Sequence, residues 1–128
     1  MAKKRVIGVM LPGTPFSLMM KDYAPARKMI DLGVPIALAT DLNPNCWIEN
    51  MQFIIQLACL NMKMNPAESI TAATFNAACS LDLQNNIGSL EKGKQADVII
   101  LDCPNHMFLP YHYGINLVKT VIKKGIII

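Results

Sequence analysis

The sequence predicts an α/β fold with a parallel sheet. Residues 6–11 (VIGVML) and 36–39 (IALA) are continuous apolar runs without polar alternation, a pattern typical of strands covered on both faces. Between them, residues 22–32 place apolar side chains at helical spacing and stop at Gly33, which is followed by Val34 and Pro35. Strand, loop, helix and strand in this order form a right-handed crossover unit of a parallel sheet.

Length and composition indicate a part of a larger assembly. The 128 residues suffice for one ordinary domain, whereas a self-contained (β/α)8 barrel needs about 250. Apolar residues make up 52% of the chain and charged residues 16%, which is more apolar surface than a small domain readily buries. A piece of something larger is therefore favoured over a small independent domain.

Two further helices and a change of pattern follow the second apolar run. Residues 49–64 are apolar on one helical side, and residues 65–80 open with Asn65 as N-cap, Pro66 at the first position and Glu68 in the first turn. Residues 82–86 are polar and lose the periodicity, which predicts a boundary between residues 1–82 and residues 83–128. Beyond it, strands are predicted at residues 98–101, 118–122 and 126–128, and so short a β segment needs about three strands and a covering face.

Charge and cysteine usage exclude several classes of protein. The net charge of +3 is spread over scattered bases, and the cluster at residues 3–5 is interpreted as a solvated terminus, so no nucleic-acid surface is predicted. Cys46, Cys59, Cys79 and Cys103 lie far apart without a C-x-x-C pair, which argues against a zinc knuckle or a redox pair. Four thiols without an export signal indicate a reducing cytoplasm, and no run approaches the roughly 20 apolar residues of a membrane helix.

Asp41 is the strongest candidate site residue. It follows the second buried strand, and the carboxyl ends of parallel strands are where ligands bind in α/β folds. The carboxylate is either a ligand or base at the mouth of a site, or an N-cap for the segment that follows. Asn43 and Asn45 either orient a substrate or make the turn, and turn formation is the safer interpretation of the pattern alone.

Other familiar site patterns are absent from the sequence. His106 and His112 lie six residues apart without a nearby carboxylate, so a structural role is favoured over a metal pair. The glycines form no G-x-G-x-x-G loop, and no serine occupies a G-x-S-x-G elbow. Cys46 follows the Asp41 loop, but without a histidine near it in sequence it is a weak nucleophile candidate.

Several runs together carry a resemblance to a known family. These runs are LPGTP at residues 11–15, ATDLNPN at 39–45, ENMQ at 49–52, AAT at 72–74 with NAA at 76–78, GSLEKGKQAD at 88–97 and PYHYG at 110–114. They resemble the carboxyl-terminal third of the imidazolonepropionase family, within the amidohydrolase superfamily, and the likeness covers residues 6–125. The G-S-L-E-x-G-K-x-A-D run is typical of the superfamily, whereas D-x-N-P-N and P-Y-H-Y-G are closer to the family.

The resemblance implies a metal-dependent hydrolase of histidine degradation that converts 4-imidazolone-5-propanoate to N-formimino-L-glutamate. By that likeness residues 6–11 and 36–40 become the last two strands of a (β/α)8 barrel, and residues 83–128 become strands of a small composite β-sandwich domain. Asp41 becomes both catalytic residue and metal ligand, with zinc or iron as the metal. Asn43, Asn45 and Cys46 become substrate-binding residues.

The resemblance also implies that essential parts lie outside this sequence. The family's H-x-H pair, its further metal-binding histidine and most of its substrate-binding side chains have no counterpart here, and one carboxylate does not retain a metal that normally has about three protein ligands. The chain is therefore expected to be inactive alone and to need the missing amino-terminal portion as a partner. Two alternatives stay open: a non-catalytic self-associating remnant that hides its open sheet edge in an oligomer, and an amidohydrolase for another cyclic amide or aminated ring.

Overall fold

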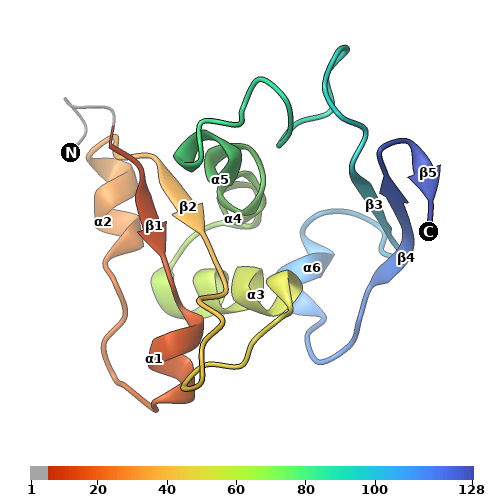
Figure 1. Ribbon diagram of the computed structural model, residues 1–128. Coiled ribbons are helices and arrows are strands. Elements are labelled where there is room, and N and C mark those ends of the chain that lie inside the picture. Colours follow the sequence, from red (N-terminus) through yellow and green to blue (C-terminus); the bar gives the residue numbers. More distant parts are fainter. Residues whose placement is uncertain (1–5) are drawn as a thin grey trace.

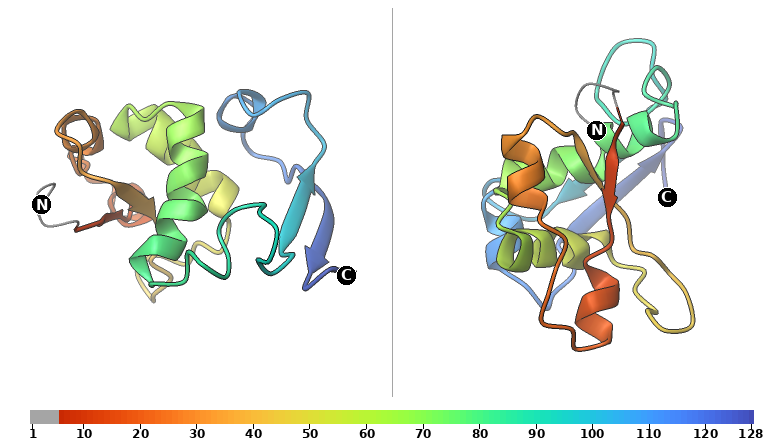
Figure 2. Two further views of the ribbon diagram at one scale, coloured as in Figure 1. Left: turned by 90° about the horizontal axis from the view of Figure 1, so that it is seen from above. Right: turned by 90° about the vertical axis from the view of Figure 1, so that its left-hand side faces the viewer.

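The computed structural model describes residues 6–128, so the basic cluster at residues 3–5 lies outside the described part. In chain order the elements are β1 (Gly8–Met10), α1 (Gly13–Ser17), α2 (Ala26–Asp31), β2 (Ile36–Leu38), α3 (Met51–Met62), α4 (Pro66–Ala73), α5 (Phe75–Ser80), β3 (Val98–Leu101), α6 (Phe108–Tyr111), β4 (Val118–Lys123) and β5 (Ile126–Ile127). Strands β1 and β2 lie at one end of the molecule and β3 to β5 at the other, with α3, α4 and α5 between them (Figures 1 and 2). No helix in the described part is long and apolar enough to cross a membrane.

The first sheet confirms the predicted crossover unit. Strands β1 and β2 pair in parallel with Gly8 opposite Ile36 and Met10 opposite Leu38, and α2 lies between them in sequence. All three residues of β2 are buried, as its continuous apolar run predicts. The same prediction is wrong for β1, where Val9 is 47% exposed, so within the described residues this strand is covered on one face only. The mixed α/β class expected from the sequence is therefore the observed class. Both strands point the same way, so their carboxyl ends lie side by side.

The core lies between β2 and the helices. Ile36 and Leu38 are 2% and 3% exposed and pack in one cluster with Ile54 of α3, Ala72 of α4 and Leu109 of α6. Helix α3 is buried along most of its length and is capped by Asn50, whose side-chain oxygen accepts hydrogen bonds from the backbone amides of Gln52 and Phe53. The apolar side predicted for residues 49–64 therefore faces the core, except for Leu60, which is 62% exposed.

The predicted helix over residues 65–80 occurs as two helices. Helix α4 opens with the expected cap, in which the Asn65 side chain and the Glu68 side chain each accept a hydrogen bond from the other's backbone amide. It ends at Ala73, and the hydroxyl of the next residue, Thr74, donates to the carbonyl of Ile70 at 2.7 Å. A threonine hydroxyl that bonds the carbonyl four residues earlier bends a helix, and α5 restarts at Phe75.

Helix α5 ends in a Schellman motif. The backbone amide of Leu83 donates to the carbonyl of Ala78 at 2.9 Å, and that of Asp82 donates to Cys79 at 3.2 Å. Asp82 has a φ of 59°, in the left-handed region where glycine is usual. Gly88 then folds back against the same helix with a φ of 94°. A Cβ at Gly88 would lie 2.6 Å from Cβ of Ala78, so only glycine fits this approach.

The second sheet contains the three predicted strands in the antiparallel order β3-β4-β5. The turn between β4 and β5 is held by Asp97, whose carboxylate accepts hydrogen bonds from the Lys123 ammonium at 2.6 Å and the Lys124 backbone amide at 2.9 Å. Isoleucines are exposed on this sheet, and they include Ile99, Ile100, Ile126 and Ile127. Because side chains alternate along a strand, Ile99 and Ile100 stand on opposite faces, so both faces carry uncovered apolar surface.

Two short helices were not predicted. Residues 12–15 were interpreted as a turn, yet α1 starts within them, and residues 104–114 were interpreted as a connecting loop, yet they contain α6. Helix α6 packs on α3, where the Gln56 side chain donates to the carbonyl of Leu109 and the Gln52 side chain accepts from the backbone amide of Leu117. The division of the chain near residue 82 stays a prediction, because these contacts join the segment after it to the central helices.

Candidate active site

The candidate active site is built where β1 and β2 end. Strand β1 runs into Pro12 and helix α1, whereas β2 runs through Ala39 and Thr40 to Asp41. The last ladder bond, from the backbone amide of Ala39 to the carbonyl of Met10 at 3.1 Å, keeps the two exits adjacent. Residues that follow either strand therefore meet at one edge of the sheet, as expected for parallel strands.

Asp41 is held at this edge by both its backbone and its side chain. Its φ of 56° is left-handed, a conformation that aspartate tolerates better than most residues. Its Oδ2 accepts a hydrogen bond from the Thr14 hydroxyl at 2.6 Å, across a separation of 27 residues. Among residues 6–128, Oδ1 of Asp41 has no hydrogen-bond partner. One carboxylate oxygen is therefore fixed while the other remains available.

The loop after Asp41 is organised by its own asparagines. The Asn43 side chain donates to the carbonyl of Asp41 and accepts from the backbone amide of Asn45 at 2.9 Å. Asn43 and Cys46 also exchange backbone hydrogen bonds at 3.1 and 3.0 Å. Much of the hydrogen-bonding capacity of Asn43 is thus used within the loop, which matches the turn-forming interpretation. Its assignment to substrate binding stays a prediction.

Cys46 is buried beneath the same loop. It is 0% exposed, and its thiol lies 3.7 Å from the carbonyl of Thr40 and close to Gly13. Asn45, in contrast, is exposed at the tip of the turn. The structure therefore brings Asp41 and Thr14 together but turns Cys46 inward. The substrate contacts of Asn45 and Cys46 stay predictions.

A pocket of about 410 Å³ opens beside Asp41, a volume within the range of small-molecule sites. Most of its wall is apolar, and Thr14, Asp22, Tyr23 and Asp41 supply polar atoms. The lining residues are Val9, Met10, Leu11, Pro12, Thr14, Pro15, Met20, Asp22, Tyr23, Ala24, Asp41 and Met62. Of the four predicted site residues, Asp41 lines this pocket, whereas Asn43, Asn45 and Cys46 do not.

Sequence reasoning missed Thr14. Residues 12–15 were interpreted only as turn residues that end the first strand. The signal that identified Asp41, a polar side chain just beyond a buried strand, applies equally to Thr14. Because parallel strands deliver such residues to one edge, the two side chains could have been paired.

The described residues supply one suitable metal ligand, Asp41, but they do not form a complete metal site. Within residues 6–128 no group of three or more histidine, cysteine, aspartate or glutamate side chains is placed to hold a metal ion. Neither His106 nor His112 lines the pocket, and the His112 ring instead packs edge-on against Phe108 with ring centroids 4.9 Å apart. A carboxylate with a free oxygen is a suitable ligand for zinc or iron, so Asp41 fits such an ion as one of several ligands.

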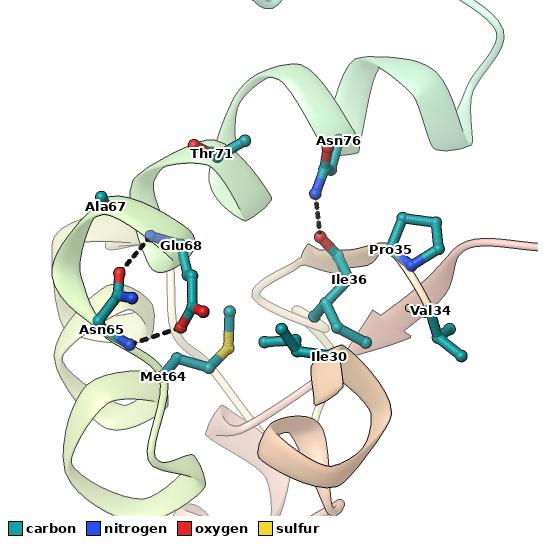
Figure 3. A pocket seen from close by; sticks show the side chains of 10 residues that line it. All are labelled: Ile30, Val34, Pro35, Ile36, Met64, Asn65, Ala67, Glu68, Thr71 and Asn76. Atoms are coloured by element: carbon teal, nitrogen blue, oxygen red, sulfur yellow. Dashed lines mark hydrogen bonds between the residues drawn. The ribbon is translucent and has the colours of Figure 1, made fainter. Parts of the chain in front are cut away.

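A second pocket of about 340 Å³ lies at the opposite, amino-terminal end of β2 (Figure 3). The side chains of Asn65, Glu68 and Asn76 in its wall already make hydrogen bonds within the chain. Glu68 makes a two-pronged ion pair with Arg27, with distances of 2.9 and 3.1 Å, and this pairing lowers the pKa of Glu68. The Asn76 side chain donates to the carbonyl of Ile36 at 2.8 Å (Figure 3). This pocket therefore presents satisfied structural contacts rather than chemistry.

Comparison with known proteins identifies the class. Residues 2–128 match the model of the amidohydrolase family, and the chain belongs to that family. Its fold matches the crystal structure of a zinc-bound adenosine deaminase from Xanthomonas campestris with a TM-score of 0.87 and 25% identity, over 98% of this chain and 32% of that one. The resemblance to amidohydrolases predicted from the sequence is thereby confirmed.

Within the family, the chain is similar to imidazolonepropionases. It is 58% identical to the imidazolonepropionase of Alkaliphilus metalliredigens over 98% of this chain and 30% of the relative. The imidazolonepropionase of Alkaliphilus oremlandii is 52% identical over 100% of this chain and 31% of that protein. The chain thus spans about a third of the length of these relatives, and the expectation that it matches only part of such an enzyme is confirmed.

Proposed function

We propose that this chain is the carboxyl-terminal part of an imidazolonepropionase, which hydrolyses 4-imidazolone-5-propanoate to N-formimino-L-glutamate. The observation that carries the proposal is the Asp41 carboxylate, which stands at the joint carboxyl edge of β1 and β2, beside a pocket of suitable volume. The identity of more than half of all positions to named imidazolonepropionases supports this substrate over other amidohydrolase substrates.

Asp41 would perform two tasks in this reaction. Its free oxygen would help to hold a divalent ion, zinc or iron, together with ligands from the remainder of the enzyme. When bound, such an ion supplies a water molecule whose pKa is lowered to about 7. Asp41 would accept the proton of the attacking water and return it to the ring nitrogen as the carbon–nitrogen bond of the cyclic amide breaks.

The loop after Asp41 would contribute to the substrate pocket. Asn43 retains one amide hydrogen beyond those used in the turn, which could donate to the substrate, and the exposed Asn45 would contact it from the rim. Cys46 would shape the pocket from beneath the loop, since its side chain is fully buried.

The rest of the enzyme would supply the strands that complete both sheets. Strands β1 and β2 would be the last two strands of an eight-stranded barrel, which needs its other six strands to close. Strands β3 to β5 would form part of a small composite domain whose further strands cover the exposed isoleucines. The partner is therefore the amino-terminal portion of the same kind of enzyme. A cytoplasmic location is proposed with it, supported by four free cysteines.

A chimera tests the proposal directly. This chain replaces the matching part of the Alkaliphilus metalliredigens enzyme, and hydrolysis of imidazolonepropanoate is measured with zinc or iron supplied. We expect activity, and we expect Asp41→Asn to lower kcat by at least about 100-fold because proton transfer and metal binding are both lost. Asp102→Asn is the matched control, since its side chain is 79% exposed in an ion pair with Lys119. A folded chimera without this activity, or an isolated chain that possesses it, would contradict the proposal.

One observation favours a second candidate, the self-associating remnant. The isoleucines on both faces of the second sheet would be covered in an oligomer of identical chains. Sedimentation of the purified chain distinguishes the self-associating remnant from the hydrolase part. A stable homo-oligomer that does not dissociate when the amino-terminal part of a related enzyme is added favours the remnant, whereas formation of a one-to-one complex favours the hydrolase.

A further inference from the structure

We propose that Thr14 is a positioning residue for Asp41. Its hydroxyl fixes one oxygen of the carboxylate and thereby directs the other toward the reacting groups. This inference rests on the proposed function, and it assigns a role to the LPGTP segment that follows β1. It depends on the 2.6 Å hydrogen bond from Thr14 to Oδ2 of Asp41.

Thr14 is itself held firmly. It lies in the first turn of α1 between Pro12, which is fully buried, and Pro15, and its carbonyl accepts the backbone amide of Leu18 at 3.0 Å. Each proline fixes its own φ angle and so restrains the backbone on either side of Thr14, and the branched Cβ of threonine limits the rotamers of the hydroxyl. A donor on a rigid turn is well suited to orient a second group.

Helix α1 is also locked against the Asp41 loop. A Cβ at the buried Gly13 would lie 2.9 Å from the Cδ1 atom of Ile48 and 3.1 Å from the thiol of Cys46. The start of α1 therefore touches residues on the far side of the loop while Thr14 bonds Asp41 on the near side. The segments that follow β1 and β2 are therefore packed together, and the hydrogen bond from Thr14 to Asp41 joins them.

The hydroxyl of Thr14 has no competing acceptor within its own helix. Threonine within a helix commonly bonds the carbonyl four residues earlier, as Thr74 does with Ile70. Thr14 lies too near the start of α1 for such a bond and no side-chain cap is formed there, so its hydroxyl is free to serve Asp41. Groups that orient a metal-binding side chain typically contribute 10- to 100-fold to metal affinity or activity.

The test compares Thr14→Ser with Thr14→Ala in the chimera described above. The two variants differ only in the hydroxyl, so packing losses cancel between them. We expect Thr14→Ala to lower kcat and to speed zinc loss to a chelator, each by about 10- to 100-fold, with KM little changed. We expect Thr14→Ser to retain most of both properties. Thr71→Val, an exposed threonine at the other end of β2, is the control and leaves both unchanged.

Two kinds of failure are distinguishable. If alanine and serine at position 14 give equal kcat and equal zinc retention in an active chimera, the positioning role of Thr14 is overturned while the proposed function stands. A merely structural role predicts this result, because both variants lose the same methyl group and its packing. If the unsubstituted chimera neither retains zinc nor hydrolyses the substrate, the proposed function fails and this inference fails with it.

Discussion

Gly88 and Gly93 offer a matched test of how the segment after α5 is held. Their φ angles are 94° and 93°, so alanine at either position suffers a similar backbone strain of about 1–2 kcal/mol. Their surroundings differ. A Cβ at Gly93 meets no atom within 4 Å, whereas one at Gly88 would lie 2.6 Å from Cβ of Ala78 and 3.2 Å from Cα of Phe75.

The magnitude follows from this difference. Alanine at Gly88 must push the loop away from the backbone of α5, and such overpacking typically costs about 1–3 kcal/mol. The loss of unfolded-chain entropy favours alanine by about 0.4–1 kcal/mol at both positions and cancels in the comparison. Gly88→Ala is therefore expected to lower the free energy of unfolding by about 1–3 kcal/mol more than Gly93→Ala.

Urea unfolding of the chimera, followed by circular dichroism, measures this difference from the midpoint and slope of each transition. The unsubstituted chimera is the reference, and the slopes must agree for the comparison to hold. Equal destabilisation by the two substitutions would refute the reasoning, since the close approach of Gly88 to α5 would then contribute nothing. A larger effect at Gly93 would refute it as well.

Two more predictions concern acidic residues in special positions. The Lys123 ammonium and the Lys124 amide lower the pKa of Asp97 from 3.8 to about 2, so its contribution to stability is present above about pH 4 and is lost as the pH falls through 2. The stability advantage of the chimera over its Asp97→Asn variant should therefore vanish between pH 4 and 2 in acid unfolding series, and an advantage independent of pH would contradict this. Asp82→Gly should raise the free energy of unfolding by about 0.5–1 kcal/mol, because glycine relieves the left-handed backbone at a cost in chain entropy. Asp82→Ala, which keeps the strain, is the control and should give no gain in thermal unfolding.

The elements predicted correctly are those with strong local signals. The two strands of the first sheet are continuous apolar runs ended by turn residues, and α4 carries its N-cap and proline in sequence. Helix α2 was predicted over residues 22–32 but spans Ala26–Asp31, because Pro25, its N-cap residue, disfavours a helical conformation at the preceding Ala24. Helix α6 was missed because Pro110 and its neighbours are typical of a loop, and contacts with α3 decide its conformation.

The candidate site was predicted in part for a similar reason. Asp41 was found from its place after a buried strand. Its hydrogen bond to Thr14 joins residues 27 positions apart, and no periodic pattern reveals such a pair. The left-handed backbone of Asp41 and the inward turn of Cys46 also depend on how the loop closes on itself. Local patterns therefore located the site, whereas its internal geometry required the tertiary structure.

The contact between Asn76 and β2 has a consequence for how a neighbouring strand would align. Because Ala37 and Ala39 bond toward β1, the peptide groups of Ile36 and Leu38 point away from it, and Asn76 already occupies the carbonyl of Ile36. A strand that pairs along this side finds the backbone amide and carbonyl of Leu38 unoccupied in the described part of the chain. At Ile36 it must share the carbonyl with the side-chain amide of Asn76 or displace that amide. If that strand paired two residues nearer the amino terminus of β2, its bond to the carbonyl of Ile36 would replace or weaken the bond from Asn76. The side-chain amide of Asn76 would therefore compete with such a strand for the carbonyl of Ile36.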